Sequence, residues 1–144
     1  MPHANENLIK AIRDTAKNLS SGARYEWGHM ARCNCGHLVQ SITKKTDKEI
    51  VKIIDHQLDE WTEHAKDYCS GTGSKVDELF ETMKSYGFSH EDIVHLEYLS
   101  DRKVLDRLGE NIYLRHNNVE DVVKYLEEMA TMLEENLENK AILV

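Results

Sequence analysis

One stretch decides the fold class of this chain: Val119-Glu-Asp-Val-Val-Lys-Tyr-Leu-Glu-Glu-Met-Ala-Thr-Met-Leu-Glu-Glu-Asn-Leu137. Apolar residues recur in it every three or four positions, and mostly charged or polar residues fill the positions between. This spacing matches the period of an α-helix, about 3.6 residues per turn, and predicts a long amphipathic helix. Asn118, directly before the stretch, is a residue type favoured as an N-cap.

The same pattern predicts helices along the rest of the chain. Residues 4–19 form an amphipathic segment that Ser20-Ser21-Gly22 interrupts. Thr46 and Glu49 have the spacing of a capping box, which indicates a helix that runs to about residue 68. Further helix starts are expected at Ser74, Ser89 and Ser100–Asp101. Residues 23–44 leave two alternatives open: one helix to about Lys44, or two pieces broken near Cys33 to Gly36.

We therefore expect a single all-α domain over residues 1–144, a helical bundle of about four main helices with two or three short inserted helices. One proline and seven glycines in 144 residues provide little of the turn material that a β-rich fold needs. Residues 1–4 carry no helical pattern and are expected to be disordered.

Charge and hydropathy exclude some classes of function. The formal charge of −8 argues against a nucleic-acid partner, because phosphate binding needs a basic face. No stretch approaches the roughly 18 consecutive apolar residues of a membrane-spanning helix. Three cysteines, two of them in a tight Cys-x-Cys spacing, are best explained as reduced thiols in a cytoplasmic protein.

Strong metal ligands and nucleophiles gather in one segment, His29-Met-Ala-Arg-Cys33-Asn-Cys35-Gly-His37. If residues 22–44 form one helix, His29, Cys33 and His37 lie on a single ridge. Sulfur and imidazole ligands favour zinc over magnesium or calcium. We therefore consider a zinc site built on these three residues. Because the ridge is about 12 Å long, other helices must complete the site.

Other segments offer the missing metal ligands. Glu60 and His64 are one helical turn apart in the helix that starts near Thr46, and His95 follows Asp92 at helical spacing. These three side chains are the candidates for completing the zinc site. Solvated charge on a helix face is the simpler explanation for Glu60 and His64.

A broken helix gives the same segment a different chemistry. If the chain breaks at Asn34, then Asn34 is the N-cap and Cys35 lies in the first turn of a short helix. A helix N-terminus stabilises a thiolate, so Cys35 is then a candidate nucleophile, with His64 or His95 as its base. Tyr25 is the aromatic residue that we expect beside this cluster.

A non-catalytic function is the remaining hypothesis. Buried cysteines often act as small hydrophobic residues, which would leave the Cys/His segment with a structural role. The chain ends in the apolar sequence Ala-Ile-Leu-Val, residues 141–144, where a polar tail is usual. This segment is a candidate contact for a second copy of the chain or for a protein partner. The sequence names no substrate.

Overall fold

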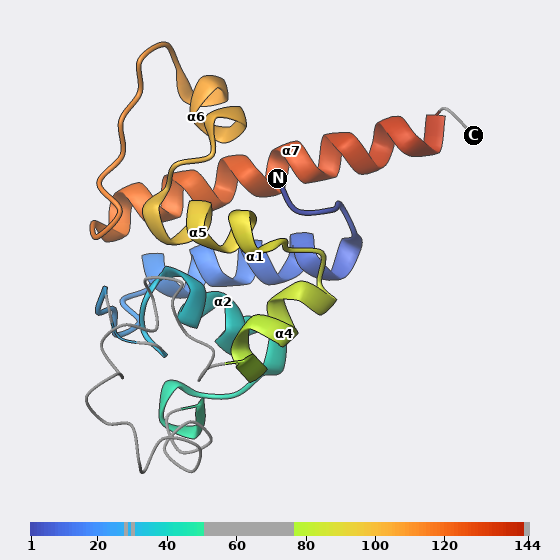
Figure 1. Ribbon diagram of the computed structural model, residues 1–144. Coiled ribbons are helices and arrows are strands. Elements are labelled where there is room, and N and C mark those ends of the chain that lie inside the picture. Colours follow the sequence, from blue (N-terminus) through green and yellow to red (C-terminus); the bar gives the residue numbers. More distant parts are fainter. Residues whose placement is uncertain (28, 30, 51–76, 143–144) are drawn as a thin grey trace.

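The computed structural model describes residues 1–27, 29, 31–50 and 77–142, without the side chains of residues 77–80 and 140–142. Within these residues the structure contains helices and no strand, so the expected all-α class is confirmed. The helices with described bounds, shown in Figure 1, are α1 (Glu6–Ser20), α2 (Asn34–Thr43), α4 (Asp77–Ser85), α5 (His90–Tyr98), α6 (Arg102–Leu108) and α7 (Val119–Ile142).

The two longest of these helices, α1 and α7, lie side by side and run in opposite directions (Figure 1). Leu8 and Ile12 of α1 are completely buried, as are Leu126 and Leu133 of α7. These residues belong to the apolar faces that the sequence spacing predicts, and burying them together supplies much of the free energy that stabilises the fold.

Polar caps set where most of the helices begin. The Asn5 Oδ1 atom accepts a hydrogen bond from the Leu8 N–H at 2.8 Å. Ser89 and Asp92 form a complete capping box at the start of α5. Three predicted helix starts, at Ser89, Asp101 and Asn118, are confirmed. Each cap satisfies an N–H group that has no partner within its own helix.

The predicted capping box at Thr46 is also present. The Glu49 N–H donates to Thr46 Oγ1 at 3.2 Å, and the Thr46 N–H donates to Glu49 Oε1 at 3.3 Å. A helix begins at Asp47, and its continuation past Ile50 lies outside the described residues, as does the predicted cap at Ser74.

The alternative of one helix over residues 23–44 is wrong. The described residues from 23 to 33 form turns and irregular chain, and α2 begins only at Asn34. Backbone hydrogen bonds hold this loop together: the Glu26 N–H donates to the Arg32 carbonyl at 3.0 Å, and the Cys33 N–H donates to the His29 carbonyl at 2.8 Å. The described residues between 23 and 33 thus form a hydrogen-bonded loop that leads into α2.

The shorter helices pack around the long pair. Helix α2 contacts α1, α4 and α5, while α6 packs on α7. The expected disorder of residues 1–4 is not tested, but in the structure the His3 N–H donates to the Gly87 carbonyl at 3.1 Å. Gly87 has a φ of 104°, a conformation that favours glycine, and a Cβ at this position would lie only 3.2 Å from atoms of His3. Both the backbone conformation and the lack of room for a side chain therefore favour glycine here.

Across the described helices, none combines the length and apolar character needed to cross a bilayer.

Candidate functional site

The first turn of α2 is built on Cys33. Its Sγ accepts a hydrogen bond from the Gly36 N–H at 3.3 Å, and its carbonyl accepts one from the His37 N–H at 2.9 Å. Cys33 is therefore the N-cap, one position earlier than the Asn34 cap expected for a broken helix. Its sulfur lies where the oxygen of a Ser or Asp cap normally lies, at the positive end of the helix dipole.

A buried carboxyl group from α5 faces this helix start. Glu97 is 1% exposed, and its Oε2 accepts a hydrogen bond from the Cys35 N–H at 3.2 Å. Its other oxygen, Oε1, has no hydrogen-bond partner among the described residues. Burial raises the pKa of the Glu97 carboxyl, and interactions with Cys35, Cys33 and Asn34 offset part of that rise. A raised pKa and an unsatisfied buried oxygen are costly features, and such features concentrate at functional sites.

The two thiols beside Glu97 are in different environments. The Cys35 Sγ donates a hydrogen bond to the Ile93 carbonyl at 3.5 Å, whereas the Cys33 Sγ accepts one from an N–H. Cys33 is 1% exposed and Cys35 is 9% exposed, and neither forms a disulfide. Both thiols also interact with the Glu97 carboxyl. Accepting an N–H favours the thiolate form of a sulfur, and donating to a carbonyl favours its thiol form.

Asn34 connects the helix start to two other segments. Its side chain is completely buried, and Nδ2 donates to the backbone carbonyls of Leu96, Glu97 and His116 at 3.2, 2.9 and 3.1 Å. Its Oδ1 accepts a hydrogen bond from the Tyr25 hydroxyl, so Tyr25 lies beside the cluster, as expected. These bonds fix α5 and the loop containing His116 against the start of α2.

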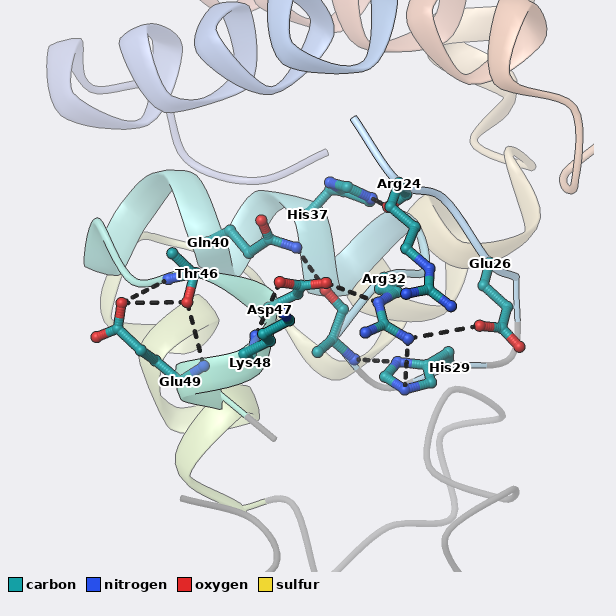
Figure 2. A network of polar contacts seen from close by, with 11 residues as sticks. Arg24, Glu26, His29, Arg32, His37, Gln40, Thr46, Asp47, Lys48 and Glu49 are labelled. Atoms are coloured by element: carbon teal, nitrogen blue, oxygen red, sulfur yellow. Dashed lines mark hydrogen bonds and ion pairs between the residues drawn. The ribbon is translucent and has the colours of Figure 1, made fainter. Parts of the chain in front are cut away.

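A second polar network lies on the loop that precedes α2. Figure 2 shows Arg32 between the carboxylates of Glu26 and Asp47. The Arg32 Nε donates to Asp47 Oδ2 at 2.7 Å, and this hydrogen bond is the main reason why the pKa of Asp47 is lowered. Arg32 thereby joins the loop to the helix that begins at Asp47.

The two histidines of the Cys/His segment are held by local contacts. The Nδ1 atom of His29 accepts the Ala31 N–H at 3.2 Å, and the His37 Nε2 donates to the Arg24 carbonyl at 2.8 Å (Figure 2). Burial lowers the pKa of both imidazoles, so each ring is held in its neutral form near pH 7.

The predicted zinc ligands are not brought together in the part of the chain that the structure describes. No group of three His, Cys, Asp or Glu side chains suited to a metal ion occurs there. His95 lies in the last turn of α5, where its Nδ1 is 2.8 Å from Ser100 Oγ. Glu60 and His64 lie outside the described residues, so their part in a metal site stays a prediction, as does that of the apolar tail in a partner contact.

Glu97, which contributes the carboxyl group of this site, was not among the site residues predicted from the sequence. A signal for it exists: Ile93, Leu96 and Glu97 occupy one face of α5 at the spacing of a buried stripe, and Glu97 is the polar member. A carboxyl group at a position where the helix pattern expects an apolar side chain indicates either a buried interaction or a functional group.

Comparison of the chain with protein-family models, with curated proteins and with solved structures gave no match. The arrangement at the start of α2 thus has to be interpreted from its own chemistry. It combines a thiol at a helix N-terminus, a second thiol two residues later and a carboxyl group that contacts both. A thiol at a helix N-terminus beside a group that can accept its proton is one arrangement that activates a cysteine nucleophile.

Proposed function

We propose that the protein is a cysteine-nucleophile enzyme in which Cys33 attacks the substrate and Glu97 accepts the proton of the thiol. The contrast between the two sulfur contacts carries this proposal. Cys33 Sγ accepts the Gly36 N–H at 3.3 Å, while Cys35 Sγ donates to a carbonyl. Because of this contrast we assign the nucleophile to Cys33. The sequence alone had suggested Cys35.

The helix supports the charge that the nucleophile must carry. Thiols at helix N-termini have pKa values of about 3.5–7.5, compared with about 8.5 for a free cysteine. The N-terminal end of α2 carries roughly half a positive charge. Because the Gly36 N–H points at Cys33 Sγ, this charge acts on the sulfur directly.

Glu97 supplies the partner for the proton. Burial raises the pKa of its carboxyl, which makes the carboxylate a stronger base than a solvated glutamate. When the S–H proton of Cys33 moves to Glu97, the thiol and carboxylate become a thiolate and a neutral carboxylic acid. The total charge of the buried site does not change, so the transfer avoids placing an additional charge in a poorly solvated region.

Burial also limits the substrate. Because Cys33 is 1% exposed, the electrophile must be small or must reach the sulfur when the surrounding segments open locally. The thiolate forms a bond to the electrophilic atom of the substrate, and the proton held by Glu97 is available for the leaving group.

Site-resolved alkylation tests the assignment of the nucleophile. The folded protein is treated briefly with iodoacetamide at pH 7, and mass spectrometry quantifies the modification of Cys33, Cys35 and Cys69. We expect Cys33 to react faster than Cys35, and the Cys35→Ser variant to keep that reactivity. Faster reaction of Cys35, or modification of Cys33 only after unfolding in urea, would contradict the proposal.

A further inference from the structure

A polar cavity lies between α1 and α2, and its lining includes neither Cys33 nor Glu97. Its volume is about 600 Å³, within the range of small-molecule pockets, about 300–1,000 Å³. The last turns of α1 and α2 form its walls together with the loop at Arg24 and the turn that leads to Asp47. His37 is a buried member of the lining.

Positive charge dominates this cavity. The cations in the lining are Lys17, Arg24, Lys44 and Lys45, and the carboxylates are Asp14 and Asp47. No described carboxylate forms an ion pair with Lys17, Arg24 or Lys45. Such a concentration stands out in a chain whose formal charge is −8.

The two carboxylates do not cancel this charge. Asp47 is already paired with Arg32 at 2.7 Å, a residue outside the cavity lining that also lies 3.7 Å from Glu26 (Figure 2). Asp14 is 3.7 Å from Lys44, a loose pair of exposed side chains. An exposed pair at this distance contributes little free energy, so Lys44 remains available to a ligand.

Helix dipoles reduce the positive charge without reversing it. Lys17 lies in the last turn of α1 and Lys44 caps the C-terminus of α2, where positive side chains offset the negative end of a helix. Two helix C-termini together contribute about one negative charge. The four lining cations exceed the two carboxylates and this dipole charge by about one unit.

We propose that this cavity binds a small molecule carrying a phosphate monoester group. The cavity keeps an excess of positive charge after its carboxylates and the helix dipoles are counted, and lysine and arginine are the side chains that bind phosphate. Asn18, Gln40 and Ser41 add neutral hydrogen-bonding groups to the lining, which suit a polar organic part such as a sugar.

The rest of the molecule argues against a nucleic acid as the occupant. The cations form one concave cluster, whereas α7 presents the exposed carboxylates of Glu120, Glu127 and Glu134 along its length. A long polyanion would extend beyond the cavity over a protein whose formal charge is −8, while a metabolite-sized molecule would stay within the cavity.

Calorimetric titration of the full chain at low ionic strength tests the proposal, with glucose 6-phosphate as the probe and glucose as the uncharged comparison. We expect glucose 6-phosphate to bind and glucose to give no signal. The double variant Lys17→Gln/Lys45→Gln should weaken binding by about tenfold or more, because two cations that face the phosphate are lost. The matched control is Lys103→Gln/Lys124→Gln, which changes the net charge equally at exposed positions on α6 and α7. It should stay within about twofold of the unmodified protein.

Three outcomes would overturn this inference. The first is the absence of glucose 6-phosphate binding at millimolar concentrations. The second is an equal loss of affinity in the two double variants, which would indicate attraction by net charge alone. The third is tighter binding of a short single-stranded DNA than of glucose 6-phosphate. None of these outcomes bears on Cys33, whose reactivity is measured separately.

Discussion

The side chain of Glu97 accepts a hydrogen bond from the backbone N–H of Cys35 at 3.2 Å, which joins α5 to the first turn of α2. The bond satisfies one of the N–H groups that a helix leaves free at its start. It also holds a buried acid beside two thiols, and within the described part of the chain Oε1 has no hydrogen bond. These are the features on which the proposed role of Glu97 rests.

Replacing Glu97 by Gln should change how stability depends on pH. Because burial raises the pKa of the folded-state carboxyl, the folded protein binds more protons than the unfolded chain above the unfolded pKa of about 4.3. Wild-type stability therefore falls as the pH rises from there through the folded-state pKa. Glu97→Gln removes this loss, so the variant should gain stability relative to wild type across that window.

Urea denaturation at several pH values between about 4 and 8 measures this difference. The control is Glu91→Gln, an exposed position on the same helix, whose stability should run parallel to that of the wild type. A constant difference between Glu97→Gln and wild type at every pH would contradict the burial of an acid with a raised pKa.

Replacing Asn34 by Ala should be strongly destabilising. The change removes the donors to the Leu96, Glu97 and His116 carbonyls and the acceptor of the Tyr25 hydroxyl. The Glu97 carbonyl keeps its bond from Trp27 Nε1, and the Tyr25 hydroxyl keeps its bond to the His116 carbonyl. Each group that is left unsatisfied costs about 1–3 kcal/mol, so we expect a total of about 2–4 kcal/mol. Denaturant unfolding checks this, with the exposed Asn7→Ala as the control. A loss below about 0.5 kcal/mol would show that the network is not formed.

The ion pair of Arg32 and Asp47 predicts a second dependence on pH. The pKa of Asp47 is lowered mainly by its hydrogen bond to Arg32, so the pair stabilises the fold above the unfolded pKa of about 3.9. That contribution disappears as the pH falls through the lowered pKa. Arg32→Gln should cost about 1 kcal/mol at pH 7 and progressively less in acid. Arg102→Gln, which breaks an exposed pair with Asp106, is the control and should have a smaller effect.

The packing of α1 on α7 supplies a test of the fold itself. Leu126 is completely buried, and truncation of such a side chain to Ala costs about 2–5 kcal/mol. Leu137 is only partly buried on the same helix, so Leu137→Ala should cost less. Thermal or urea unfolding of the two variants makes the comparison. An equal effect at the two positions would contradict the arrangement of these helices.

Much of the fold was predictable from local chemistry. The period of the stretch from Val119 to Leu137 and the caps at Ser89, Asp101 and Asn118 determine their helices through neighbouring residues alone. The break before α2 was harder to predict, because Ala31, Leu38 and Ile42 keep a helical spacing across it. The loop is stabilised instead by non-helical backbone bonds and by Arg32, whose partner Asp47 lies 15 residues later.

Only the local features of the site could be predicted from the sequence. The sequence indicated the Cys/His segment and the helix start near Cys35, since both are local features. It did not indicate that Cys33 Sγ would serve as the N-cap, because cysteine is rarely counted among cap residues. It did not place Glu97 there either, because Cys35 and Glu97 are 62 residues apart and meet only through the packing of α2 on α5.

The pH dependence of Cys33 alkylation tests the central claim most directly. The rate is measured in a Cys35→Ser/Cys69→Ser background, with Glu97 present and with Glu97→Gln. If Cys33 and Glu97 exchange one proton, their titrations are coupled. The alkylation rate should then rise with pH in two steps when Glu97 is present, and in a single step in the Glu97→Gln variant. The first step should lie below the free-thiol value of about 8.5. A single step at or above that value, unchanged by Glu97→Gln, would contradict the account.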